Sequence, residues 1–155
     1  MDISFSALFT SGHCDPAGEA DRLFPTVVRQ SSLRLFNPDE PIPTSGTRIL
    51  LGVATWMTYN LRLLDVIDTG LSQTDNKDLV IDVVNVGRVM QEELDQLFPG
   101  IGHIFHMPVM GLWRDGILTE TASGGAACDR VAKMFGSSCD EITRFVRELQ
   151  TAPAA

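Results

Sequence analysis

The sequence predicts one α/β domain in which a central mixed β-sheet is flanked by helices and preceded by an N-terminal extension. Residues 48–54 and 78–86 are continuous apolar runs, typical of strands buried on both faces, and a helical pattern separates them. Asp115-Gly116 stands between two β-rich runs and signals a hairpin, because both turn positions favour positive φ. A βαβ unit followed by a hairpin and a C-terminal helix specifies a mixed sheet with helices on both faces.

Helices of this domain are predicted from apolar spacing and from stop signals. Residues 57–71 and 89–98 carry apolar side chains near helical spacing, and a glycine or proline ends each run. Residues 126–135 and 138–150 are predicted to be the last two helices, split at Gly136.

The first 46 residues show only short predicted elements and a proline-rich segment. A helix start is predicted at Asp15-Pro16, an extended segment over residues 24–28 and a short strand over residues 32–36. Residues 37–43 contain three prolines and are predicted to be a surface loop or linker, because proline cannot donate a backbone hydrogen bond. The predicted division of the chain is therefore an extension (1–46), a domain (47–150) and a short tail (151–155).

Composition narrows the classes of partner. The chain has 155 residues, 20 acidic and 12 basic side chains, and a formal charge of −8. Nucleic-acid binding depends on Lys and Arg clusters, and anionic membrane surfaces repel an acidic protein, so neither partner is expected. Three scattered cysteines, the lack of a secretory signal and the lack of a long apolar run predict a cytoplasmic protein with reduced thiols.

Residues 102–124 carry a family resemblance. An apolar residue precedes Pro108, a buried strand follows, a charged residue and a glycine reverse the chain, and the next strand ends at glycine. This order resembles the second half of the thioredoxin-like fold, and the resemblance extends from about Thr47 to Gln150. It implies that Pro108 follows a cis peptide bond and leaves the backbone of Met107 open to a partner. An ordinary trans proline at a strand start is the alternative.

The same resemblance locates the position of the family's redox motif, Trp-Cys-x-x-Cys, at Trp56-Met57-Thr58-Tyr59-Asn60. Met57 and Asn60 stand where the two cysteines would be. Disulfide exchange requires a thiolate, and neither a thioether nor a carboxamide can replace it. Classical disulfide oxidoreductase activity is therefore not expected, and no cofactor is predicted.

The face that holds the redox motif in the family is instead predicted to bind a partner protein or peptide here, because aromatic and thioether side chains provide adaptable contact area. The function expected is that of an assembly chaperone, adaptor or complex subunit, similar to redox-inactive family members such as bacterial hydrogenase-maturation chaperones. The predicted binding residues are Trp56, Met57, Thr58, Tyr59, Asn60, His106, Met107 and Pro108.

Two other functions stay open. The first is a thiol- or glutathione-dependent enzyme, using Cys14 as a reactive thiol or a ligand site beside Pro108. The second is a structural subunit whose apolar face is covered by self-association into a homo-oligomer. A metal site is not predicted, since His103 and His106 have no sequence-near third ligand.

Overall fold

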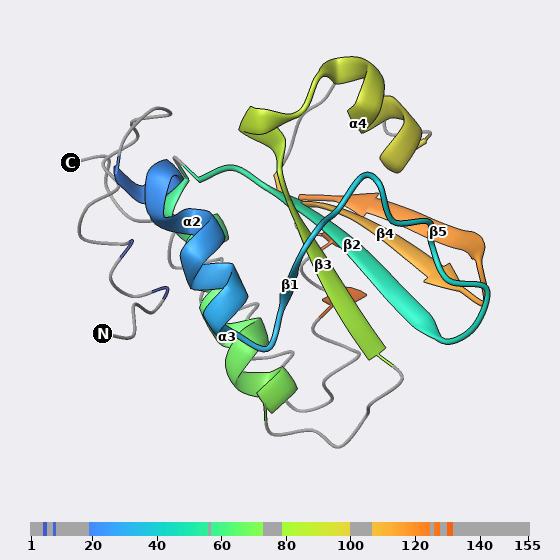
Figure 1. Ribbon diagram of the computed structural model, residues 1–155, viewed down its shortest axis with the longest axis horizontal. Coiled ribbons are helices and arrows are strands. Elements are labelled where there is room, and N and C mark those ends of the chain that lie inside the picture. Colours follow the sequence, from blue (N-terminus) through green and yellow to red (C-terminus); the bar gives the residue numbers. More distant parts are fainter. Residues whose placement is uncertain are drawn as a thin grey trace.

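The computed structural model describes residues 5, 8, 19–55, 57–72, 79–99, 107–124, 126–127 and 130–131. Its elements, in chain order, are α2 (Glu19–Gln30), β1 (Arg34–Leu35), β2 (Thr47–Val53), α3 (Thr58–Ser72), β3 (Leu79–Asn85), a 3₁₀ turn (Val86–Arg88), α4 (Gln91–Leu97), β4 (Val109–Arg114) and β5 (Ile117–Ser123) (Figure 1). None of the helices in this described part is long and apolar enough to cross a membrane.

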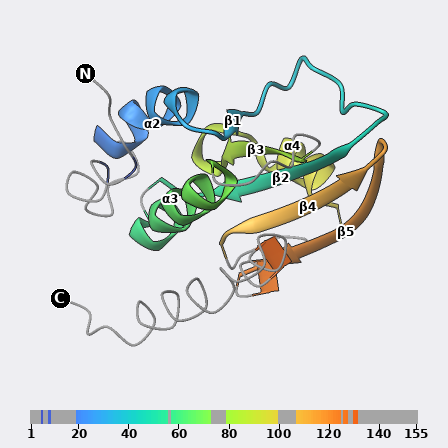
Figure 2. The same ribbon diagram turned by 90° about the horizontal axis from the view of Figure 1, so that it is seen from below.

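The strands form one mixed sheet in the order β1-β3-β2-β4-β5. β1, β3 and β2 run parallel, whereas β4 is antiparallel to β2 and β5 is antiparallel to β4. Figure 2 shows the sheet with β1 at one edge and β5 at the other. The predicted mixed sheet is confirmed, and the two buried strands predicted over residues 48–54 and 78–86 lie within one residue of β2 and β3.

The helix predicted over residues 57–71 is confirmed as α3, and the next helix is shorter than predicted. α4 begins only at Gln91, because residues 86–88 form a 3₁₀ turn and Val89 returns to an extended conformation with φ −119° and ψ 149°. Most of the residues of the two helices predicted after Gly125 lie outside the described residues.

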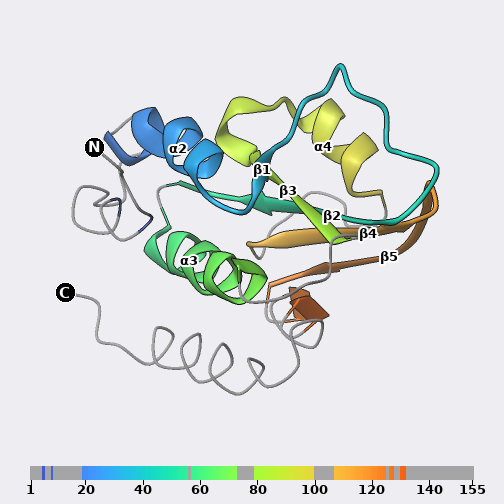
Figure 3. The same cartoon turned by 60° about the horizontal axis from the view of Figure 1, so that its bottom comes forward.

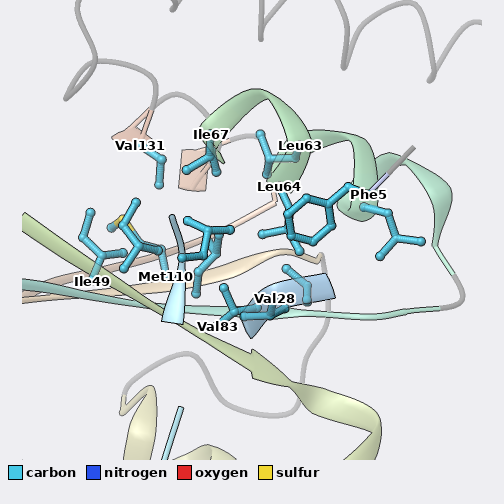
Figure 4. Close-up of a cluster of buried hydrophobic side chains, with 14 of the residues drawn as sticks. Phe5, Val28, Ile49, Leu63, Leu64, Ile67, Val83, Met110 and Val131 are labelled. Atoms are coloured by element: carbon cyan, nitrogen blue, oxygen red, sulfur yellow. The ribbon is translucent and has the colours of Figure 1, made fainter. Parts of the chain in front are cut away.

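Two hydrophobic clusters sandwich the sheet. The cluster on the α3 side contains Ile49 and Leu51 of β2, side chains of α3, and also Phe5 and Val28 (Figure 4). The cluster on the α4 side contains Leu50, Val84, Phe98 and Val109. Since side chains of a strand alternate between faces, adjacent residues of β2 supply the two clusters in turn. Figure 3 shows α3 and α4 on opposite sides of the sheet.

The prediction of an extended segment over residues 24–28 is wrong, because these residues lie inside α2. Pro25 within a helix costs about 3 kcal/mol. Phe24, Val27 and Val28 share one face of α2, however, and each is at most 1% exposed. Burial of a large apolar side chain contributes about 1.5–3 kcal/mol, so the three together outweigh the proline.

Part of the predicted N-terminal extension contributes to the same sheet and core. The short strand predicted over residues 32–36 is confirmed as β1, whose Arg34 and Leu35 lie opposite Asp82 and Val83 of β3. The proline-rich segment 37–43 contains no helix or strand, as predicted, and it leads from β1 towards β2.

The predicted hairpin joins β4 to β5. Asp115 has φ 50° and Gly116 has φ 84°, so both turn residues adopt the left-handed conformation that the Asp-Gly pair favours. The Asp115 carboxylate also accepts a hydrogen bond of 3.0 Å from the backbone N–H of Gly46. The hairpin turn is thereby fixed to the segment that enters β2.

Candidate functional site

The start of β4 lies at the same end of the sheet as the segment that connects β2 to α3. Gly52 of β2 is opposite Val109 of β4 in the antiparallel pair, so the chain enters β4 where β2 ends. The Met107–Pro108 peptide bond is cis, as the resemblance implies. The carbonyl oxygen of Pro108 accepts a hydrogen bond of 2.8 Å from the N–H of Gly124, at the end of β5.

A tight turn connects β2 to α3. The N–H of Met57 donates to the carbonyl of Ala54 at 3.1 Å, and the N–H of Asn60 donates to the carbonyl of Met57 at 3.0 Å. The Asn60 side chain closes the turn, because its Oδ1 accepts a hydrogen bond of 3.0 Å from the N–H of Ala54. Asn60 is 0% exposed, so its carboxamide supports the backbone of the turn and offers no surface to a partner.

The predicted binding residues divide into three groups. Met57 and Met107 are half-buried, and Pro108 is buried like Asn60. Thr58 and Tyr59 begin α3, but their side chains are outside the description, as are the whole of Trp56, His106 and Cys14. Among the predicted binding residues whose side chains are described, Met57 and Met107 are therefore the two that are partly accessible.

A buried polar cluster that the sequence analysis did not predict lies beside this turn. Asp21 of α2 is 4% exposed. Its Oδ1 accepts hydrogen bonds of 2.9 Å from Thr55 Oγ1 and from Asn85 Nδ2. Its Oδ2 accepts from Arg88 Nε at 2.9 Å and also from Arg88 Nη2. We call these four residues the Asp21 cluster.

The Asp21 cluster joins α2 to the carboxyl ends of β2 and β3. Thr55 follows β2 and directly precedes Trp56, Asn85 ends β3, and Arg88 lies in the 3₁₀ turn. Burial raises the pKa of Asp21, but the hydrogen bonds from Asn85, Arg88 and Thr55 and the charge of Arg88 outweigh burial and hold the pKa below its usual value. Asp21 is therefore ionised at neutral pH.

One signal in the sequence pointed to Asp21. Residues 21, 24 and 28 recur at helical spacing, so a helix over this segment puts Asp21 on the same face as Phe24 and Val28. A carboxylate on a buried face needs partners. The prediction of an extended segment over residues 24–28 concealed this spacing.

A cavity of about 540 Å³ adjoins the Asp21 cluster. Its walls come from α2 (Phe24 and Pro25), from the end of β1 and the residues after it (Phe36 and Pro38), and from Val89 before α4. Asp21, Asn85 and Arg88 also line it. The described residues contain no group of three or more His, Cys, Asp or Glu side chains that could hold a metal ion.

Comparison with known proteins shows similarity only at the level of structure. No protein-family model matches the chain, and no curated protein matches it significantly. Among solved structures, a thioredoxin from Malassezia sympodialis is 16% identical with a TM-score of 0.46, over 75% of this chain and 92% of that one. Zinc-bound human ERp44 is 14% identical (TM-score 0.46, 79% of this chain), and ERdj5 is 13% identical (TM-score 0.45, 81% of this chain).

This chain spans only 31% of the ERp44 chain and 14% of the ERdj5 chain. At such identities a likeness concerns the fold alone and transfers no activity. The mixed sheet, the helices on its two faces and the hairpin are those that the sequence predicted, and the strand order β1-β3-β2-β4-β5 comes from the structure. The chain has a thioredoxin-like α/β fold, with a mixed five-stranded sheet between helices.

Proposed function

We propose that this protein is a non-catalytic thioredoxin-like protein that binds a partner polypeptide, as an assembly chaperone, adaptor or complex subunit. The binding face is at the end of the sheet where β2 ends and β4 begins. One observation carries the proposal. The resemblance aligns Met57 and Asn60 with the two cysteines of the family's redox motif, and the Asn60 carboxamide is buried and accepts a hydrogen bond from the N–H of Ala54. A buried amide that closes a turn supports a structural role for this position.

Two methionines support a binding role for this end of the sheet. Met57 precedes α3, Met107 precedes Pro108, and both are half-buried, so part of each side chain is accessible. Methionine is flexible and polarisable, and it adapts to partners of irregular shape. Trp56, Thr58, Tyr59 and His106 are the further contact residues that we predict at this face.

Site-specific photo-crosslinking in the native host tests the proposal. A photoreactive phenylalanine analogue is placed at Met57, at Met107 or, as the matched control, at Met90, which is 66% exposed and precedes α4. We expect the same polypeptide to be crosslinked from positions 57 and 107 and not from position 90. Met57→Asp should then reduce recovery of that polypeptide at least tenfold, while Met90→Asp leaves recovery unchanged.

Two results would contradict the proposal. One is equal crosslinking from all three positions, which would indicate non-specific contact. The other is disulfide reductase activity of the purified protein that disappears in Cys14→Ser, which would favour a thiol enzyme.

A further inference from the structure

The cavity beside the Asp21 cluster is a separate feature from the Met57–Met107 face. It lies at the carboxyl ends of the parallel strands, the end of an open α/β sheet where ligands usually bind. The connection after β2 is α3, on one face of the sheet, and the connection after β3 leads through the 3₁₀ turn to α4, on the other face (Figure 3). The Asp21 cluster lies at this change of face, and a cavity of about 540 Å³ is within the size range of small-molecule sites.

The walls of the cavity are apolar and partly planar. Phe24 and Pro25 come from α2, and Phe36 and Pro38 come from the segment after β1. Phe24 is 0% exposed, so it supports the wall from within the core, and the accessible wall surface comes from half-buried Pro25 and Phe36 and from exposed Pro38. The N–H of Phe36 donates to the carbonyl of Val83 at 3.0 Å, which holds this wall against β3. Such walls fit an aromatic or branched apolar body.

The polar end of the cavity has hydrogen-bond donors to spare. Each oxygen of Asp21 already accepts two hydrogen bonds, so this carboxylate has no free acceptor position. Asn85 Oδ1 accepts from the N–H of Gly87. By contrast, Arg88 Nη1 donates to none of the described residues, and its side chain is 68% exposed. A ligand at this end therefore has to supply an acceptor.

The cavity is lined by charged groups of both signs. The four charged lining residues are Asp21, Glu93, Arg22 and Arg88, and they balance. Of the two carboxylates, Asp21 is buried and fully hydrogen-bonded, whereas Glu93 is solvent-exposed on α4. The Arg88 guanidinium has unused N–H groups beside the apolar walls, and a guanidinium binds carbonyl and carboxylate oxygens well.

We propose that this cavity is a binding site for a small molecule with an aromatic or branched apolar body and one carbonyl or carboxylate oxygen, which accepts from Arg88. The body lies between Pro25 of α2 and the Phe36-Pro38 wall. The proposal does not depend on partner binding at Met57 and Met107.

Three probes with the same phenyl body test this site: phenylacetamide, phenylacetate and phenethylammonium. Titration is followed in ¹H–¹⁵N spectra of the full chain. For ligands of this size we expect the two acceptor probes to bind with Kd on the order of millimolar. Their shifts should be confined to Leu35, Phe36, Asn85 and Arg88 and absent from the hairpin turn at Asp115. Phenethylammonium should bind at least tenfold more weakly.

A variant pair checks the role of the guanidinium. Arg88→Lys keeps a positive charge beside Asp21 but removes the planar array of donors, and it should weaken both acceptor probes several-fold. Arg29→Lys, an exposed substitution of the same kind on α2, should leave binding unchanged.

The probe series uses the unmodified chain, so it remains decisive if a variant fails to fold. The proposal is overturned if neither acceptor probe gives saturable shifts, if phenethylammonium binds as well as the acceptors, or if the shifts map away from the cavity.

Discussion

Two buried aspartates in this protein are held by different kinds of environment. Asp82 of β3 is 3% exposed and lies between cations on both neighbouring strands. Arg48 Nη1 of β2 lies 2.7 Å from Asp82 Oδ2, and Arg34 Nε of β1 lies 3.5 Å from Asp82 Oδ1. Asp21 is similarly buried, but its partners come from a loop end, a strand end and a 3₁₀ turn.

The exposure of the cationic partner separates the two sites. Arg48 is the closer of the two cations on Asp82, and its side chain is 11% exposed, so the Arg48–Asp82 pair is largely shielded from water, while Arg34 is 42% exposed. The Arg88 side chain is 68% exposed, so the Asp21 cluster opens to solvent and to the cavity. A closed pair fixes strands to one another, whereas an open cluster leaves donors for a ligand. The Asp21 cluster, which is the open one, lies at the carboxyl ends of β2 and β3.

The largest loss of unfolding free energy is expected when the Arg48–Asp82 pair is broken. Asp82→Ala leaves the Arg48 guanidinium buried without its closest acceptor, and breaking a buried pair from one side costs about 3–5 kcal/mol of unfolding free energy. Urea unfolding measures this loss.

A double substitution separates the lost pair from lost packing. Replacing both partners by apolar groups, as in Arg48→Met with Asp82→Leu, removes the uncompensated charge and should recover most of the stability. A double variant as unstable as Asp82→Ala would show that the ion pair itself, and not the stranded arginine, accounts for the effect.

A smaller loss is expected at the open cluster. In Asp21→Ala the exposed Arg88 side chain regains water, so the main cost is the buried Thr55 hydroxyl without its acceptor, about 1–3 kcal/mol. Hydrogen exchange should also accelerate around Thr55 and the start of α3, because Asp21 holds the end of β2. A loss above that of Asp82→Ala would reverse the ranking of the two sites.

The Asp21 contribution has a defined pH dependence. Because the pKa of Asp21 is lower in the folded chain than in the unfolded chain, its stabilisation is complete above the unfolded pKa of about 4 and is lost as the pH falls through the folded value. The stability difference between the natural chain and Asp21→Asn should therefore be constant at neutral pH and shrink below about pH 4. A difference that grows in acid would have the wrong sign.

The sequence was sufficient for elements whose signals are local. Apolar runs predicted β2 and β3, and Asp115-Gly116 predicted the turn whose two φ angles are positive. The resemblance implied the cis bond before Pro108. Each of these depends on neighbours in the chain or on backbone rules that act over a few residues.

The two buried aspartates depend on contacts that no local rule contains. Asp21 meets Arg88 across 67 residues, and Asp82 meets Arg48 across 34. Pro25 also favoured a break where tertiary burial of α2 sustains a helix. At such positions the sequence predicts that a partner exists but does not identify it, because a carboxylate within the apolar run of β3 or on the buried face of α2 requires a hydrogen-bond donor or a cation.

The smallest effect on stability is expected at Asp65 of α3, a partly buried carboxylate whose pKa shifts in the opposite direction to that of Asp21. Burial raises its pKa, and repulsion from Asp68 one turn away raises it further. A carboxyl whose folded pKa is raised costs stability as the pH rises through the interval between its unfolded and folded values. Asp65→Asn should therefore stabilise the protein at neutral pH by about 0.5 kcal/mol or less, and the gain should vanish below about pH 4. Thermal unfolding at pH 7 and pH 3.5 measures both values, with exposed Asp95→Asn of α4 as the control. A loss of stability at pH 7 would show that Asp65, like Asp21, has a compensating donor.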